Sequence, residues 1–284
     1  LKSEPVINLP IITAAPGTEY AEHPFFEASS VRKINGKYYF IYSSTWMHEL
    51  CWAVADTPLG EYRYGGVLVS NSDIGANGNK EALNYRGNTH GSVALVNGKW
   101  YVFYHRQTNR HFFSRQACAE EIYFDGEAFH QAEITSCGLN GGPLADKGIY
   151  EARIACHLYS ENRTTESLAE QQDENHPAFT QEGEDRECDP NQYINNMRDG
   201  ATAGFRYFMF DTATRINVTV RGTASGVFKV RDERGGQVVA TINISPSEDW
   251  ATFGSELSIE KGKKPLYFTY EGDGFADFKS FELF

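Results

Sequence analysis

The sequence predicts an all-β protein made of a partial β-propeller, residues 1–145, and a C-terminal β-sandwich, residues 146–284. Three observations support this fold class. Aromatic residues make up 14% of the chain, and long stretches of helix-period apolar spacing are missing. A hairpin pattern with an Asn-Gly turn occurs twice, and short alternating strand-like segments follow Gly204.

The repeated hairpins span residues 31–42 and 93–104, and Gly98 follows Gly36 by 62 residues. Each copy reads as a strand, an Asn-Gly turn and a second strand rich in aromatic and β-branched residues. A period of this size with several strands per unit is typical of a propeller, whose innermost strands line a central channel. Adding this period to Glu27 gives Thr89, one place before His90, so Glu27 and His90 enter equivalent strands and we expect both side chains in one axial pocket. The alternative is two surface hairpins whose Glu and His are solvated.

The first region holds little more than two such units. Residues 50–55 and 64–69 complete the first unit, and residues 112–115 and 121–126 belong to the second. Propellers close with about four to eight blades. We therefore expect the remaining blades either N-terminal to Leu1 or on a second polypeptide.

The second region reads as a β-sandwich, because short segments recur every 8 to 12 residues with Gly-rich turns between them. Residues 150–158 are expected to give its first strand. Residues 166–189 carry nine acidic side chains against Arg186 alone and predict a solvated loop, with calcium capture as the alternative. The later strands are expected at residues 205–210, 216–221, 227–230, 238–244, 250–259, 266–270 and 278–284.

The net charge of −12 disfavours nucleic acid and anionic membranes as partners but suits a neutral ligand such as a sugar. No apolar run approaches the roughly 18 residues that cross a bilayer. No secretory signal is visible, and the chain begins with Leu1 rather than Met. The compartment stays open, with an extracellular or periplasmic location favoured. The five cysteines lack Cys-x-x-Cys spacing, which argues against a zinc site and a dense disulfide framework.

Several motifs in order resemble glycoside hydrolase family 43. They are residues 25–30 with 36–39, residues 88–92 with 98–101 and 104–106, and residues 114–116 followed by 125–126. Residues 150–284 resemble a family 6 carbohydrate-binding module, a jelly-roll-like β-sandwich, through their strand pattern and Trp250.

The first resemblance implies a five-bladed propeller that removes terminal arabinofuranose, xylose or related units from plant polysaccharides with inversion. Inverting enzymes use one carboxylic acid and one carboxylate about 6.5–9.5 Å apart. Glu27 matches the acid of the family, and Phe26 beside it is expected to bind substrate. The alternative is a Glu27 that only pairs with Arg32 or Lys33.

The resemblance also assigns four substrate-binding candidates. His90 matches an axial histidine that lies beneath the sugar and helps to hold calcium through water, and Arg115 matches an arginine that reaches the pocket. Trp46 and Tyr85 are candidates for sugar-stacking walls. The alternatives are a packed histidine, a surface arginine and two core aromatics.

The sequence departs from the family pattern in its aspartates. The base and a second Asp of the family lie before the Glu motif, whereas residues 1–22 contain no Asp. Asp56, Asp73 and Asp125 follow Glu27 in turn-like contexts and do not match. We therefore expect the C-terminal part of a glycosidase, inactive alone, that acts on arabinose- or xylose-containing glycans and is completed by an N-terminal fragment. The alternatives are a non-catalytic carbohydrate-binding protein and a structural adhesin-like β-protein.

Overall fold

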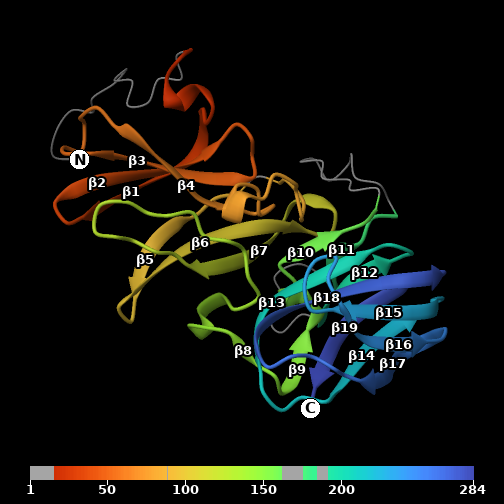
Figure 1. Ribbon diagram of the computed structural model, residues 1–284. Coiled ribbons are helices and arrows are strands. Elements are labelled where there is room, and N and C mark those ends of the chain that lie inside the picture. The colour runs from red at the N-terminus through yellow and green to blue at the C-terminus, as the bar shows by residue number, and fades with distance from the viewer. Residues whose placement is uncertain (1–15, 88, 162–174, 184–190) are drawn as a thin grey trace.

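The structure is a computed structural model that describes residues 16–87, 89–161, 175–183 and 191–284. Within these ranges the chain forms strands β1 to β19 and short 3-10 helices, and no α-helix occurs. Two small sheets from the first half lie beside a sandwich from the second half (Figure 1). No helix in the described ranges is long and apolar enough to span a bilayer.

The first sheet is a four-stranded antiparallel meander in the order β1-β2-β3-β4. Asn35 and Gly36 form its first turn with φ values of 49° and 84°, the left-handed conformations that this tight hairpin requires. The predicted hairpin is therefore confirmed. The strands are β1 (Phe25–Ile34), β2 (Lys37–Ser44), β3 (Glu49–Ala55) and β4 (Arg63–Ser70).

The second sheet repeats the hairpin and adds one strand, in the order β5-β6-β7. Asn97 and Gly98 again have positive φ values, 50° and 81°. Ser30 of β1 and Ser92 of β5 are hydrogen-bonded through their hydroxyl groups at 3.0 Å and are 62 residues apart. The leading strands of the two repeated units are thus neighbours. The strands are β5 (Ser92–Val96), β6 (Lys99–Thr108) and β7 (His111–Glu121).

The sandwich consists of two six-stranded sheets. One has the order β10-β13-β18-β15-β16 with β8 paired to β13, and the other has the order β11-β12-β19-β14-β17 with β9 paired to β19. The strands are β8 (Leu144–Ala145), β9 (Gly148–Glu151), β10 (His157–Tyr159), β11 (Ala178–Glu182), β12 (Asn191–Met197), β13 (Thr202–Phe210), β14 (Arg215–Gly222), β15 (Ser225–Arg231), β16 (Val238–Ile244), β17 (Ser247–Glu256), β18 (Gly262–Asp273) and β19 (Ala276–Leu283).

An aromatic core holds the two sandwich sheets together. Phe205, Phe228, Phe268 and Phe278 are fully buried, and rings from facing sheets meet at centroid distances such as 5.5 Å between Phe228 and Phe278. Such pairs combine large apolar burial with favourable ring geometry. The all-β fold of propeller-like sheets followed by a β-sandwich is confirmed.

The acidic stretch differs from the predicted loop. Strand β11 lies within it and pairs with β12, which follows it, and Phe179 and Ile194 enter the sandwich core. Eight of the nine acidic residues lie outside the described ranges; they are Glu166, Glu170, Asp173, Glu174, Glu184, Asp185, Glu187 and Asp189.

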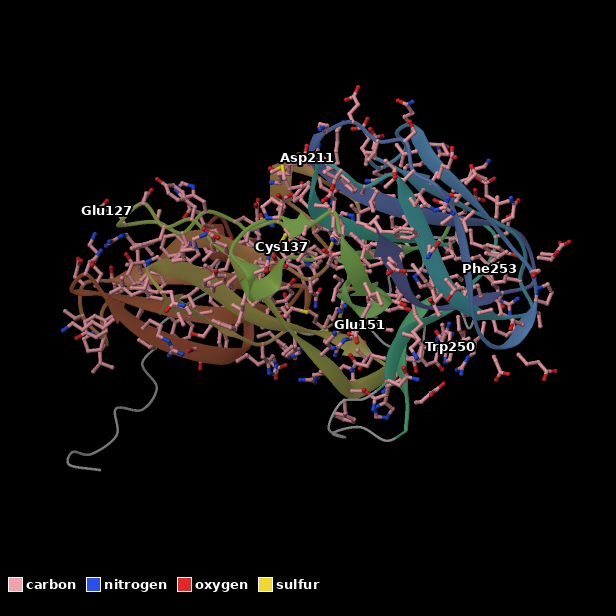
Figure 2. The ribbon with its side chains drawn as sticks, turned by 90° about the horizontal axis from the view of Figure 1, so that it is seen from below. Glu127, Cys137, Glu151, Asp211, Trp250 and Phe253 are labelled. Carbon is pink, nitrogen blue, oxygen red and sulfur yellow. The ribbon has the colours of Figure 1, made fainter. Side chains whose placement is uncertain are left out.

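Polar contacts fix the sandwich to the first half. Asp73, which follows β4, accepts hydrogen bonds from Arg206 Nη2 at 2.8 Å and His157 Nε2 at 2.9 Å. All three residues are at most 8% exposed. Burial lowers the pKa of His157 to about 4, so its imidazole is neutral at pH 7. Seen from below, Glu127 marks the far end of the first half, Phe253 lies in the sandwich, and Cys137 lies between them (Figure 2).

Candidate active site

Glu27 lies near the beginning of β1, where the strand is irregular. Glu27 pairs with Ser43 and Ser30 pairs with Ile41, so the register shifts between these two pairs. Ala28 has a φ of 62°, an uncommon left-handed conformation for a residue other than glycine. An irregularity of this kind redirects side chains, as bulges next to active sites do.

His90 enters from the second repeated unit, just before β5. Its Nε2 lies 2.7 Å from Glu27 Oε1, and the two side chains are 36% and 40% exposed. The predicted meeting of this carboxyl group and this imidazole is therefore confirmed. Either the imidazole donates to the carboxylate or the carboxylic acid donates to the imidazole, so the pair can hold one proton within reach of solvent.

His105 on β6 lies beside His90 and is hydrogen-bonded to its backbone. Its Nε2 accepts a hydrogen bond from the backbone N–H of His90 at 3.1 Å, and Arg115 Nη1 lies 3.4 Å from the same atom. Burial, together with the positive charge of Arg115, lowers the pKa of His105 to about 4. A neutral ring that accepts at Nε2 carries its proton on Nδ1. His105 is thus a fixed acceptor that orients His90 and Arg115.

Arg115 on β7 is exposed and lies at the outer side of this cluster. Its Nε donates to the carbonyl oxygen of Phe112 at 3.4 Å, and its guanidinium carbon lies 5.9 Å from the Phe112 ring centroid. The structure thus brings Glu27, His90 and Arg115, three of the predicted site residues, together around His105.

Phe26 and Trp46 are both exposed, at 48% and 57%. Trp46 Nε1 donates to the carbonyl oxygen of Glu22 at 2.7 Å, which fixes the indole against the segment before β1. Their roles in substrate binding stay predictions.

Tyr85 does not fit the predicted sugar-stacking role. Its ring is 4% exposed, its hydroxyl group donates to the carbonyl oxygen of Pro177, and it packs against His176 at a centroid distance of 5.3 Å. Both neighbours belong to the second half of the chain. A ring enclosed in this way has no free face for a sugar, and Tyr85 instead helps to join the two halves.

The donors around His90 do not match calcium. Ca²⁺ takes six to eight oxygen ligands, whereas His90 Nε2 is hydrogen-bonded to the one carboxylate beside it. Among the described residues, the His, Cys, Asp and Glu side chains grouped closely enough to hold a metal are His23, Glu49 and Cys51. Calcium at the axis stays a prediction.

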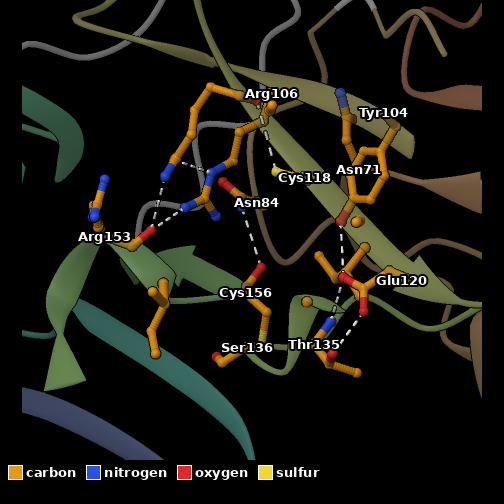
Figure 3. A pocket seen from close by; sticks show the side chains of 16 residues that line it. Asn71, Asn84, Tyr104, Arg106, Cys118, Glu120, Thr135, Ser136, Arg153 and Cys156 are labelled. Carbon is orange, nitrogen blue, oxygen red and sulfur yellow. Dashed lines mark hydrogen bonds between the residues drawn. The ribbon is translucent and has the colours of Figure 1, made fainter. Parts of the chain in front are cut away.

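A separate cavity of about 150 Å³ lies between β6, β7 and the sandwich (Figure 3). Arg106, Glu120 and Arg153 line it, and Glu27 and His90 do not. Figure 3 shows Arg106 turned toward the backbone of Arg153, and Glu120 between Tyr104 and Thr135. This cavity belongs to the contact between the two halves.

Comparisons with known proteins show what this chain is similar to. No family model matches the sequence. A xylosidase/arabinosidase from Thermoclostridium stercorarium is 43% identical over 286 residues, which are 99% of this chain and 60% of that protein. A family 43 arabinoxylan arabinofuranohydrolase from Bacillus subtilis, solved with cellotetraose, superposes on 91% of this chain and 54% of its own with a TM-score of 0.50 at 19% identity. The chain is thus similar to a xylosidase/arabinosidase and shares the fold of a family 43 enzyme.

Other similarities of this chain are shorter. A β-xylosidase from Xylanibacter ruminicola is 37% identical over 107 residues, 37% of this chain and 30% of that protein. A family 6 carbohydrate-binding module from Clostridium stercorarium superposes on 50% of this chain and 97% of its own with a TM-score of 0.40 at 15% identity. The chain spans about three-fifths of the T. stercorarium protein.

His105 is the member of this site that has no role in the sequence-based prediction. A sequence signal for it exists. His105 follows Ser43 by 62 residues, the repeat length, and Ser43 is the cross-strand partner of Glu27. Applying the repeat to Ser43 as well as to Glu27 would have placed His105 beside the axial pocket.

Proposed function

We propose that this chain is the C-terminal part of an inverting glycoside hydrolase that removes arabinofuranosyl or xylosyl units from plant polysaccharides or oligosaccharides. The observation that supports the reaction is the 2.7 Å contact between Glu27 and His90, made between two neighbouring sheets. The substrate class rests on the T. stercorarium xylosidase/arabinosidase and the X. ruminicola β-xylosidase.

Glu27 is the proposed general acid. In an inverting reaction a carboxylic acid protonates the leaving glycosidic oxygen while a second carboxylate activates water on the opposite face of the sugar. The Glu27–His90 pair can hold the required proton, and its partial exposure leaves room for a sugar. His105 holds the backbone of His90 in place.

The proposed base does not come from the nearby aspartates of the first half. Asp73 is enclosed by His157 and Arg206, and Asp125 accepts hydrogen bonds from the backbone N–H groups of Glu127 and Ala128 at 2.9 and 2.8 Å. Asp56 is exposed in the turn after β3. We therefore propose that other blades of the propeller supply the base and that this chain alone is inactive.

Two further contacts belong to the proposal. Arg115 offers guanidinium donors to sugar hydroxyl groups, and the exposed rings of Phe26 and Trp46 offer faces on which a sugar can pack. The proposed partner is therefore a neutral arabinose- or xylose-containing glycan. An N-terminal fragment that completes the propeller is the second proposed partner.

The test is an assay of 4-nitrophenyl α-L-arabinofuranoside and 4-nitrophenyl β-D-xyloside. We expect no turnover by this chain alone, and turnover when it is joined to the part of the T. stercorarium protein that it does not span. Glu27→Gln in the joined protein should lower kcat by about 10²- to 10⁴-fold, because the amide cannot supply the proton.

Glu121→Gln is the matched control, because Glu121 forms an exposed pair with Lys99 on the second sheet. It should leave kcat unchanged. Turnover by the isolated chain that is lost in Glu27→Gln would contradict its proposed inactivity, and an unchanged kcat of Glu27→Gln in the joined protein would contradict the role of Glu27. Glycan binding without turnover in the joined protein would instead favour a non-catalytic carbohydrate-binding protein.

A further inference from the structure

The β6–β7 hairpin presents different residues on its two faces. His105 and Ala117 are cross-strand partners, as are Arg106 and Gln116. Because side chains alternate along strands, His105 and Arg115 lie on one face, and Arg106 and Gln116 lie on the other; Phe113 lies in the irregular segment next to the turn, where the register shifts. The first face contains the residues that contact His90, and the second faces the sandwich.

The second face is firmly held by the sandwich. Arg106 donates from Nη1 and Nη2 to the carbonyl oxygens of Ala155 and Arg153, and from Nε to Gln116 Oε1 at 3.0 Å. Its guanidinium carbon also lies 3.6 Å from the centroid of the Phe179 ring on β11. These contacts fix the direction of the hairpin relative to the sandwich.

The tip of the hairpin is held as well. Asn109 and Arg110 form the turn, with φ values of 55° and 47°. The backbone N–H of Asn109 donates to the carbonyl oxygen of Phe179 at 2.8 Å, and Thr180 Oγ1 donates to Asn109 Oδ1 at 3.0 Å. Arg110 Nη2 donates to the carbonyl oxygen of His176. A hairpin tip of this kind would otherwise be among the more mobile parts of a protein.

The aromatic ring of Phe113 is exposed near the tip of this hairpin. Phe113 is 77% exposed, and its ring meets that of Phe112 edge to face at a centroid distance of 5.2 Å. Phe112 in turn lies beside the Arg115 guanidinium, which contacts His105, the residue that holds His90. The exposed ring is thus continuous with the Glu27 cluster.

We propose that Phe113, with Arg115 beside it, binds the glycan chain that flanks the sugar at Glu27, and that the sandwich serves to hold this platform in place. This inference rests on the proposed function. Aromatic rings present an apolar face on which a sugar ring can pack, and a guanidinium group donates to hydroxyl groups beside it. Because the tip is already ordered, little conformational entropy is lost when the glycan binds. The occupant is a neutral chain of pentose units, which is compatible with the net charge of −12.

The test is isothermal titration calorimetry of the full chain with xylohexaose. Phe113→Ala should weaken binding about tenfold through the loss of one stacking contact. Tyr123→Ala is the matched control, because Tyr123 is an aromatic residue with a similar exposure of 68% that packs against His130, away from the hairpin tip. It should bind as the wild type does. Thr180→Val, which removes the hydrogen bond to Asn109, should weaken binding about two- to threefold.

Equal affinities of Phe113→Ala and the wild type, or no binding of xylohexaose by the wild-type chain, would overturn the inference. An unchanged affinity in Thr180→Val would overturn the role given to the sandwich. The readout is binding by this chain, whereas the proposed function depends on hydrolysis by the joined protein. The two proposals therefore fail on different measurements.

Discussion

At the scale of single residues, Glu120 shows how the contact between the halves controls a charge. Its side chain is 3% exposed and accepts hydrogen bonds from Thr135 Oγ1 at 2.6 Å, Thr135 N at 2.8 Å and the Tyr104 hydroxyl group at 3.1 Å. Burial outweighs these contacts and raises its pKa to about 8. Glu120 is therefore protonated in the folded protein at neutral pH.

A raised pKa makes stability fall as the pH rises. The folded protein keeps the proton of Glu120 up to about pH 8, whereas the unfolded chain releases it near 4.5. The stabilisation is complete below pH 4.5 and is lost progressively up to pH 8, on the order of 5 kcal/mol in total. We expect Glu120→Gln, which stays neutral, to remove this loss.

The measurement is urea unfolding at pH 5, 7 and 9. The free energy of unfolding of the wild type relative to Glu120→Gln should decrease across this series. Parallel pH profiles for the two proteins would show that Glu120 titrates normally. Comparison at each pH removes the contribution of other groups, such as His105 and His157, because both proteins share them.

At the scale of elements, the two Asn-Gly hairpins set the register on which the site depends. In the second one, Val96 pairs with Lys99 and Ser92 pairs with Phe103, so the turn determines where β5 begins. His90 lies two residues before that strand. A tight turn with both central residues in left-handed conformation therefore places the imidazole opposite Glu27.

We expect Gly98→Ala to lower the free energy of unfolding by about 1 kcal/mol, because φ at Gly98 is 81° and a Cβ is unfavourable there. Gly142→Ala is the control. A Cβ at Gly142 meets no atom within 4 Å, and its φ is not in the left-handed region. The control should change stability by less than about 0.5 kcal/mol. Chemical denaturation of both variants checks this prediction, and equal stabilities would contradict it.

At the scale of the whole molecule, buried polar groups join the first half to the sandwich. Asp73 contacts His157 and Arg206, and Arg206 Nη1 also lies 3.2 Å from Glu133 Oε2. Asp73 and Glu133 belong to the first half, and His157 and Arg206 belong to the sandwich strands. The halves therefore share one buried charge network, and removing one member leaves another without its partner.

Asp73→Ala should lower the free energy of unfolding by about 3 kcal/mol, because Arg206 loses a buried partner. The two halves should then unfold in separate calorimetric transitions. Glu121→Ala breaks the ion pair with Lys99, in which the Glu121 and Lys99 side chains are 48% and 44% exposed. This control should lower the free energy of unfolding by less than about 1 kcal/mol. A single unshifted transition in Asp73→Ala would show that apolar packing alone joins the halves.

Most of the strands, the Asn-Gly turns and the meeting of Glu27 with His90 could be predicted from the sequence, because these depend on residues close in the chain and on a repeat visible in it. Tertiary structure alone decided which polar-loop side chains are buried. Tyr85 bonds to Pro177, 92 residues away, and Asp73 bonds to Arg206, 133 residues away. The local pattern of apolar and polar residues does not predict contacts between residues so far apart in the chain. Burial depends on what packs over a residue, and for Tyr85 and Asp73 that is a second layer formed much later in the chain.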